Sequence, residues 1–268
     1  MQHRAAAVGN GRAPDEVGGL GNPAERPGAQ VNVNKVERGN KPMPDRLLSG
    51  IKACVFDAYG TLFDFASAAR ACVDVPDEAV ERLTTLWRDK QLQYTWLRAA
   101  QGRHADFLQV TADALDFTLE TLGLERLRGR LLELYLTLAA FPEVPGVLAK
   151  VRAAGLKTAI LSNGTPAMLA AAVGAAGLAG QFDVVLSVEE VGAFKPDRRV
   201  YQLAVDRLGI PSTAIAFVSS NGWDAYAASA FGMRVVWCNR SAQRGERLPG
   251  APDSEITTLA GLPALVGA

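Results

Sequence analysis

Short apolar runs that end in a small polar or charged residue recur along the chain from Lys52 onward. Runs this short, rich in Val and Ile, are typical of strands buried on both faces of a parallel sheet. Helical patterns such as PGVLAKVRAAG and RRVYQLAVDRLG separate them. The chain is therefore predicted to be an α/β protein with right-handed crossovers. The predicted strands are KACVFD ending at Asp57, KTAILS ending at Ser162, FDVVLS ending at Ser187, AIAFVS ending at Ser219 and RVVWCN ending at Asn239.

The interval between the first two predicted strands is far longer than the later strand-to-strand intervals. Residues 66–142 hold no clear strand pattern, but they contain the helical patterns DEAVERLTTLWRDKQLQYTWLRAA, DFLQVTADALDFTLETLG and LRGRLLELYLTLAA. The segment FPEVPG follows them and has the composition of a domain boundary. We therefore expect a helical cap domain at 66–142, inserted into an α/β core formed by 46–65 and 143–268.

The first fifty residues contain eight Gly, five Pro and no aromatic residue. They include no apolar run long enough for a secretory signal or a membrane span. This composition predicts a disordered N-terminal extension over residues 1–45. Met43 lies just before the first predicted strand, so we also expect that translation naturally begins there.

Charge and cysteine content exclude several classes of protein. Lys plus Arg and Asp plus Glu both number 28, which makes nucleic acid a poor candidate for a partner. Cys54, Cys72 and Cys238 form no CxxC pair, which argues against a disulfide framework or a zinc site and favours a reducing, cytoplasmic environment. His3 and His104 are the two histidines, so a mechanism that needs a histidine base has few candidates.

Polar side chains follow the predicted strands at their carboxyl ends, where ligands bind in open parallel sheets. Asp57 suits nucleophilic attack by a carboxylate, although an Asp at this point is also common as a turn or helix cap. Lys195, in the GAFKPD loop, favours the interpretation of Asp57 as a nucleophile, because a nearby ammonium would hold its carboxylate ionised. The group expected to converge consists of Asp57, Thr61, Ser162, Asn163, Lys195, Ser219, Asn221 and Asp224.

These residues stand in motifs that resemble a known family. DAYGTL, LSNGT, the Lys195-Pro196-Asp197 loop and SSNGWDAYAA are similar to the haloacid dehalogenase superfamily from about Ile51 to the C-terminus. WRDKQLQYTWLRAAQGRHADF, VYQLA and SSNGWD resemble the L-2-haloacid dehalogenases in particular. The resemblance implies a Rossmann-like parallel sheet with an inserted helical cap, and a homodimer. It also implies hydrolytic dehalogenation of L-2-haloacids to D-2-hydroxy acids, with inversion, through an ester on Asp57.

Two departures from the phosphatase branch of the superfamily bear on the chemistry. Phosphatases carry DxDxT, whose second Asp protonates the leaving group, but Tyr59 stands at that position here. They also gather carboxylates for magnesium after the fourth strand, where SSNGWD supplies Asp224 alone. We therefore expect no metal and no cofactor, and a leaving group that departs as a weak base, such as halide. A magnesium-dependent phosphatase and a non-catalytic binding protein are the alternatives.

By resemblance, Arg88 faces the active site and receives the departing halide, although an Arg on an amphipathic helix can equally lie in solvent. Ser162 and Asn163 would bind the substrate carboxylate, or would only shape a loop. Thr61 would donate to the nucleophile or to the ester, or would serve as a cap.

The same resemblance assigns roles to the residues around the nucleophile. Lys195, Tyr201 and Ser219 would orient Asp57, while Asn221 and Asp224 would position or activate the hydrolytic water. Asp224 is a candidate for the general base, and Lys195 is the alternative.

An apolar wall completes the expected pocket. Tyr59, Leu92, Phe107 and Trp223 would surround the halogen and the alkyl group, although ordinary core packing would equally account for them. Asp89 stands where relatives often have Gln, and it would either weaken anion binding or point to solvent.

Overall fold

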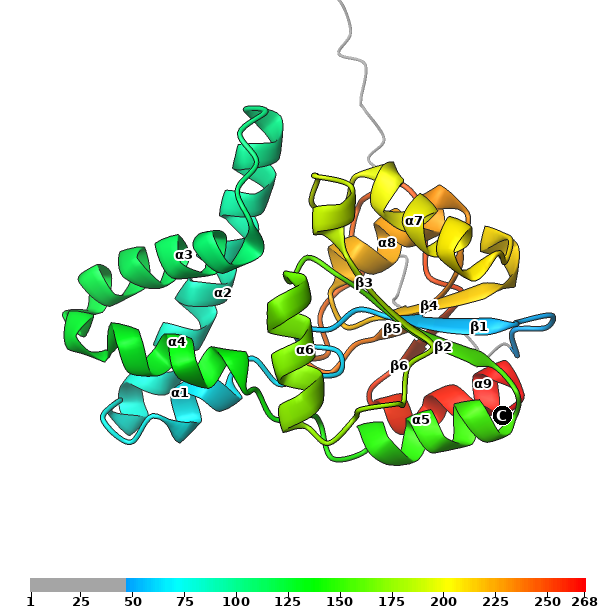
Figure 1. Cartoon of the computed structure of the whole chain (residues 1–268), viewed down its shortest axis with the longest axis horizontal. Coiled ribbons are helices and arrows are strands. Elements are labelled where there is room, and N and C mark those ends of the chain that lie inside the picture. Colours follow the sequence, from blue (N-terminus) through cyan, green and yellow to red (C-terminus); the bar gives the residue numbers. More distant parts are fainter. Residues whose placement is uncertain (1–46) are drawn as a thin grey trace, which may run out of the picture. The chain divides into compact units, whose positions relative to one another are not determined.

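The computed structural model describes residues 47–268, and within them one parallel sheet has the strand order β3-β2-β1-β4-β5-β6. Figure 1 shows this sheet with helices on both sides. The predicted α/β fold with a parallel sheet is confirmed. The strands are β1 (Ala53–Phe56), β2 (Lys157–Ser162), β3 (Val184–Ser187), β4 (Ile215–Ser219), β5 (Arg234–Cys238) and β6 (Ser254–Ile256).

The strand ends differ from the prediction at two places, and one strand is new. β1 ends at Phe56 and β5 ends at Cys238, so Asp57 and Asn239 are the first residues beyond their strands. β6 was not predicted because this edge strand, with the sequence SEI, has no apolar run and is only partly buried. β1 and β4 have every residue buried, as central strands covered on both faces require.

Helices α5 and α9 cover one face of the sheet, and α7 and α8 cover the other (Figure 1). The side chains of Thr165 and Asp197 cap α6 and α7, each accepting a hydrogen bond from a backbone N–H in the first turn. The core helices are α5 (Val144–Ala153), α6 (Pro166–Ala175), α7 (Arg198–Leu208), α8 (Gly222–Phe231) and α9 (Leu262–Val266), with short 3₁₀ helices η2 (Val188–Glu190), η3 (Ser212–Ala214) and η4 (Leu259–Gly261).

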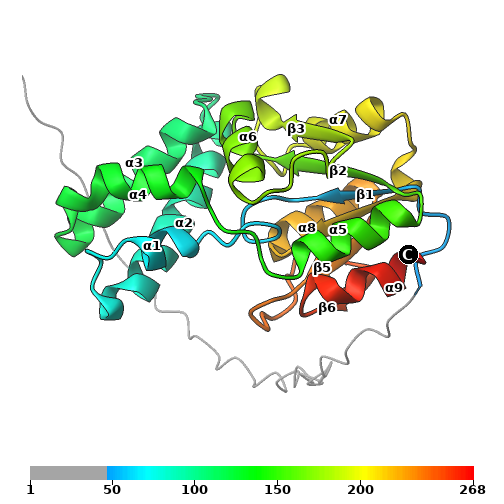
Figure 2. The same cartoon turned by 60° about the horizontal axis from the view of Figure 1, so that its bottom comes forward.

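Four α-helices follow β1 and precede α5, and Figures 1 and 2 show them together beside the sheet. They are α1 (Ser67–Ala71), α2 (Asp77–Ala100), α3 (Phe107–Leu122) and α4 (Arg128–Leu136), with the 3₁₀ helix η1 (Glu125–Leu127). α2 matches its predicted pattern and packs along α3. Asp106 caps the start of α3, and Gly123, at φ 67°, caps its end. α1 was not predicted, and α4 is shorter than its pattern.

The two chain segments that lead into and out of these helices pair with each other. The backbone N–H of Phe141 donates to the carbonyl of Leu62 at 3.0 Å, and that of Asp64 donates to Ala139 at 2.8 Å. The entry and exit of the helical segment are therefore held side by side, next to the end of β1.

Arg240, beyond β5, holds both of these segments. Its guanidinium donates to the carbonyl of Thr61 at 2.9 Å and pairs with Glu143 at 2.7 Å. It also lies over the ring of Phe141, 3.6 Å from the centroid. One core residue thus fixes the segment before the helices and the segment after them.

Several sequence-based expectations concern features other than the sheet order. The predicted disorder of residues 1–45 and the start at Met43 lie outside the described residues. Among the helices of residues 47–268, none is long and apolar enough to cross a membrane. Cys54, Cys72 and Cys238 are buried free thiols.

Candidate active site

Asp57 is the first residue after β1 and is held by one donor from its own loop and by donors from two other segments. Its Oδ2 accepts from Thr61 Oγ1 at 3.1 Å and from Asn221 Nδ2 at 2.8 Å. Its Oδ1 accepts from Lys195 Nζ at 3.1 Å. The Asp57 side chain is only 9% exposed, so these hydrogen bonds replace the hydration that an ionised carboxylate needs.

Lys195 lies between two carboxylates. Its Nζ is 3.1 Å from Asp57 Oδ1 and 2.8 Å from Asp224 Oδ2, and the lysine side chain is 1% exposed. Burial by itself lowers the pKa of Lys195, but Asp224 and Asp57 more than offset that effect and raise the pKa above its ordinary value. The raised pKa favours the charged ammonium beside the Asp57 carboxyl group.

Asp224 lies beneath this ammonium and is fully buried. Burial raises the pKa of Asp224, and the neighbouring Asp57 adds to the rise, although Lys195 and Tyr201 oppose it. Tyr201 donates its hydroxyl to Asp224 Oδ1 at 2.7 Å. Burial and Asp224 raise the pKa of Tyr201 well above its ordinary value, so the hydroxyl remains a donor. Tyr201 was expected to orient Asp57; its hydroxyl contacts Asp224, which shares Lys195 with Asp57, and the expected role stays a prediction.

Asn221 contacts the nucleophile directly, and Ser219 holds the turn that carries Asn221. Asn221 donates directly to Asp57, whereas Ser219 Oγ accepts from the backbone N–H of Asn221 at 3.2 Å. Ser219 is the last residue of β4, so its short side chain reaches the backbone of its own turn rather than the neighbouring strand. It acts on Asp57 through Asn221.

Thr61 is fixed from two sides. Its Oγ1 accepts from the backbone N–H of Ser220 at 2.8 Å, so its proton is directed to Asp57. Gly60, at φ 87°, makes the tight turn that brings Thr61 back to the strand end. Thr61 is therefore a fixed donor to the carboxylate.

Ser162 and Asn163, at the end of β2, shape the loops beside Asp57. Ser162 Oγ accepts from the backbone N–H of Gly164 at 3.1 Å, and Asn163 Oδ1 accepts from the backbone N–H of Lys195 at 3.0 Å. Asn163 thus holds the backbone of the residue whose ammonium contacts Asp57. The predicted role of this pair toward a substrate carboxylate stays a prediction.

Arg88 reaches the site from α2. Its Nη2 donates to Asn221 Oδ1 at 3.2 Å and to the carbonyl of Tyr59 at 3.4 Å, and its guanidinium lies 5.4 Å from the centroid of the Phe65 ring. The alternative, an arginine free in solvent, is wrong because this side chain is half-buried and bonded to the core.

The predicted apolar wall separates into two groups. Tyr59 and Phe107 are buried with their ring centroids 5.6 Å apart, while Trp223 makes an edge contact with Trp96 at 5.4 Å. Leu92 lies half-buried on α2. The Trp pair joins α2 to α8, so it is a second contact of the helical segment with the core besides Arg88.

The donor set does not fit a divalent cation. Lys195 Nζ takes the position between Asp57 and Asp224 that a metal bridging the two carboxylates would need. Among residues 47–268, no group of three or more His, Cys, Asp or Glu side chains is arranged to hold a metal ion.

Comparison with known proteins identifies the family of this chain. Residues 51–232 match the haloacid dehalogenase-like hydrolase family. The chain belongs to this family. It is 47% identical over 212 residues to an (S)-2-haloacid dehalogenase of Pseudomonas sp. strain YL, covering 78% of this chain and 91% of that protein.

Other relatives and structures agree with this membership of the haloacid dehalogenase-like hydrolases. An (S)-2-haloacid dehalogenase of Pseudomonas fluorescens is 42% identical, over 80% of this chain and 95% of that protein. The structure of the L-2-haloacid dehalogenase from Xanthobacter autotrophicus with chloropropionic acid covalently bound is 41% identical, with a TM-score of 0.75, and covers 80% of this chain and 98% of that chain. The resemblance to L-2-haloacid dehalogenases is therefore confirmed.

Two residues that contact this dehalogenase-like site were missed in the sequence. Gln91 accepts from Arg88 Nη1 at 2.7 Å, and the ring of Tyr135 stacks on Tyr59 with centroids 5.5 Å apart. The spacing of Gln91, three residues after Arg88 on one helix, was the available signal. Tyr135 lies on α4, and the sequence around it contains no signal that would have placed it at the site. Asp89 is exposed, which favours the expectation that its side chain points to solvent rather than weakening anion binding.

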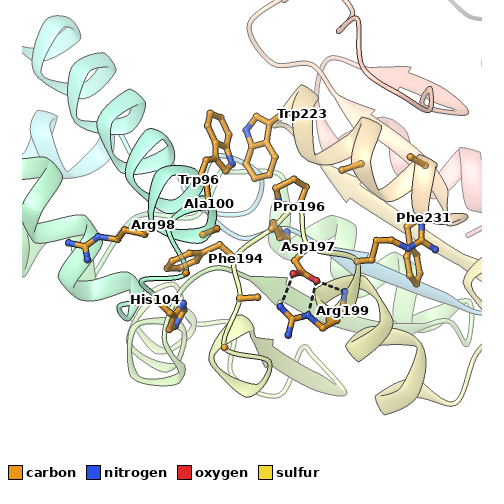
Figure 3. A pocket seen from close by; sticks show the side chains of 18 of the residues that line it. Trp96, Arg98, Ala100, His104, Phe194, Pro196, Asp197, Arg199, Trp223 and Phe231 are labelled. Atoms are coloured by element: carbon orange, nitrogen blue, oxygen red, sulfur yellow. Dashed lines mark hydrogen bonds and ion pairs between the residues drawn. The ribbon is translucent and has the colours of Figure 1, made fainter.

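A groove of about 1000 Å³ lies beside the site, between the end of α2, the start of α7 and the length of α8 (Figure 3). Lys195 and Trp223 are the predicted site residues that line it, and Trp96 and Trp223 stand together at one of its walls (Figure 3). His104 also lines the groove, and its Nε2 lies 3.1 Å from Glu189 Oε2.

Lys195→Met is expected to lower the free energy of unfolding by about 3–5 kcal/mol at about pH 7, because two buried carboxylates then lack a cation. Burial already raises the pKa of Asp224, and the loss of Lys195 removes a contact that opposes the rise. The folded variant should therefore bind a proton more readily than the unfolded chain, and its deficit should shrink as the pH falls toward about 5.

Urea denaturation at several pH values measures this deficit. Lys52→Met, at an exposed lysine, is the matched control and should stay within about 0.5 kcal/mol of the wild type. A deficit in Lys195→Met that grows toward acid pH would contradict the assigned charges.

Proposed function

We propose that the protein is an L-2-haloacid dehalogenase, which converts small L-2-haloacids such as 2-chloropropionate to D-2-hydroxy acids without a metal ion. The observation that carries the proposal is the Asp57 carboxylate held against the Lys195 ammonium at 3.1 Å. This pair combines an anionic nucleophile with a cation that occupies the position of a bridging metal. The names of the curated relatives support the substrate class.

In the first step, an oxygen of Asp57 attacks C2 of the haloacid from the side opposite the halogen. Oδ2 accepts two hydrogen bonds and Oδ1 accepts one, so we assign the attack to Oδ1, which has the freer lone pair. The new C–O bond forms as the C–halogen bond breaks, and the halide leaves with the bonding electron pair. Attack from the opposite side inverts C2 and leaves an ester on Asp57.

The halide would leave toward Arg88 and Trp223. Arg88 Nε and Trp223 Nε1 are buried N–H groups without a hydrogen-bond partner, and both can only donate. A guanidinium is permanently charged and weakly hydrated, which suits a large monovalent anion. Asn221, bonded to both Arg88 and Asp57, would link halide departure to the nucleophile.

In the second step, water adds to the Cγ carbon of Asp57, and the bond between Cγ and the ester oxygen breaks. The hydroxy acid leaves with the original aspartate oxygen, so C2 keeps its inverted configuration. We assign the first water proton to Asp224, because burial raises the pKa of this carboxyl and makes it a better acceptor than an ordinary aspartate. Asp224 would return this proton to the oxygen of the leaving hydroxy acid. The second water proton would pass to solvent as Asp57 regains its carboxylate. Thr61 and Asn221 would stabilise the oxyanion on the remaining oxygen.

The remaining site residues would bind the rest of the substrate. Ser162 and Asn163 end a buried strand beside the Lys195 loop, where their hydroxyl and amide hydrogens suit a carboxylate. Tyr59 and Phe107 would contact the alkyl group, since both rings are buried and lie next to each other.

We further propose that residues 66–142 act as a cap domain over a core of residues 46–65 and 143–268. Arg88 crosses from this helical segment to Asn221, so a closed cap completes the halide site. The paired segments at Leu62–Asp64 and Ala139–Phe141 would be the hinge.

Halide release from L-2-chloropropionate is expected to persist in excess EDTA, while phosphate esters should stay intact with or without magnesium. A chloride assay measures the first and a phosphate assay the second. Asp57→Ala should lower halide release by about 10⁴-fold or more while the protein stays folded. Asp89→Ala, at an exposed acid of α2, is the control and should keep its activity. Loss of activity in EDTA that magnesium restores would support the phosphatase-like alternative.

A single turnover in H₂¹⁸O is expected to leave the label in Asp57 and not in the hydroxy acid. The reason is that the new oxygen of the product comes from the carboxylate and water replaces it there. Mass spectrometry of the Asp57 peptide and of the product measures both. Label in the product after the first turnover would mean that water attacks C2 directly.

We also propose that the protein forms a homodimer through the outer face of α2 and α3. Leu97 and Phe117 are 49% and 39% exposed and line one shared hollow of about 600 Å³. Sedimentation velocity is expected to give twice the chain mass, and Phe117→Asp should shift it to the monomer because a charge would be buried. A monomeric wild type at micromolar concentration would refute the proposal.

A further inference from the structure

Gln91 is an uncharged amide buried among the helices, next to the guanidinium proposed to receive the halide. It lies on α2 and is 1% exposed. Its Oε1 accepts from Arg88 Nη1 at 2.7 Å, while its Nε2 donates to Thr111 Oγ1 at 2.7 Å and to the hydroxyl of Tyr135 at 3.0 Å. Residues from α2, α3 and α4 therefore meet at this one side chain.

The contacts fix which end of the amide faces Arg88. The Thr111 hydroxyl donates its proton to the carbonyl of Phe107 at 2.6 Å, so Thr111 Oγ1 accepts from Gln91. The Nε2 end must point to Thr111, and the carbonyl end must point to Arg88. Arg88 is thus held by a neutral oxygen with a fixed direction.

A neutral acceptor at this position has an electrostatic consequence. A carboxylate would hold Arg88 more strongly, but it would also neutralise the guanidinium. The amide oxygen orients one edge of the guanidinium and leaves the full positive charge for an anion. The other groups facing Gln91 do not change this balance, because burial raises the pKa of Tyr135 and keeps its hydroxyl neutral.

We propose that Gln91 is a positioning residue that holds Arg88 without neutralising it, and thereby sets the affinity of the site for halide. The proposal rests on the dehalogenase function, in which Arg88 receives the halide. Because Gln91 acts through Arg88 at 2.7 Å, its effect should be largest on anion binding and small on the attacking carboxylate.

The test compares Gln91→Glu with Gln93→Glu. Both variants place one carboxylate on α2, but Gln93 is exposed, where it accepts from Lys90 at 2.9 Å. The inhibition constant of added bromide in the halide-release assay is expected to rise tenfold or more in Gln91→Glu and to stay unchanged in Gln93→Glu. The increase in the inhibition constant should grow with pH, because only the ionised carboxylate of the new Glu neutralises Arg88. The other titratable groups nearby do not produce this trend: Tyr135, which faces Gln91, stays neutral, and Asp57 is common to both variants.

A second measurement protects the test against misfolding and against failure of the proposed function. Bromide should raise the melting temperature of the wild type and of Gln93→Glu, and this shift should be lost in Gln91→Glu. In an Arg88→Ala background, Gln91→Glu should have no further effect on bromide binding, because the two residues act as a unit.

The outcomes separate the two proposals. A wild type that releases no halide from any 2-haloacid, yet shows the bromide-linked shift, would overturn the proposed function alone. Equal bromide binding in folded Gln91→Glu and in the wild type would overturn the role of Gln91, whatever the activity. Gln91→Met removes the hydrogen bond without adding charge, and it should weaken bromide binding less than Gln91→Glu does. The reverse order would also overturn the proposal.

Discussion

The ammonium of Lys195, buried between Asp57 and Asp224, determines how the rest of the site must be built. Transfer of a charge out of water is strongly unfavourable unless the charge is paired and hydrogen-bonded. Lys195 Nζ contacts both carboxyl groups, at 3.1 Å from Asp57 and 2.8 Å from Asp224, in a region that solvent hardly reaches. Arg88 is a half-buried cation that comes from α2 rather than from the sheet, and Asn221 links it to the group by accepting from Arg88 and donating to Asp57. A helix outside the sheet therefore contributes a residue that is linked to the nucleophile.

A second chain of contacts also connects the helical segment with Asp57. Thr61 donates to the carboxylate with its hydroxyl, and its carbonyl accepts from Arg240. Arg240 in turn pairs with Glu143, on the segment that leads out of the helices. A movement of that segment would therefore be transmitted to a residue that holds the nucleophile. The chain thus couples the geometry of Asp57 to the position of the helices that carry Arg88.

Sequence reasoning identified the residues at the strand ends because one geometric rule covers them all. Parallel strands end at the same edge, so Asp57, Lys195 and Asn221 had to converge once the strands were recognised. Partner assignments within that edge were less predictable: Tyr201 holds Asp224, and Ser219 holds the backbone of Asn221. These depend on side-chain rotamers and on distances of a few ångströms, which apolar periodicity does not encode. β6 and α1 were missed for a related reason, because both are short and lack a clear pattern.

The residues that sequence reasoning missed also connect the two ends of the pocket. Tyr135 donates toward Gln91 and stacks on Tyr59, whose ring lies against Gly164. A Cβ at position 164 would lie 2.8 Å from the Tyr59 ring, so only glycine lets that ring sit there without a shift. Gly164 belongs to the loop proposed for the substrate carboxylate, and Gln91 holds the proposed halide receptor. Tyr59 and Tyr135 therefore form one packed unit between the carboxylate end and the halide end, and a change at either end would displace the wall against which the carbon centre must lie.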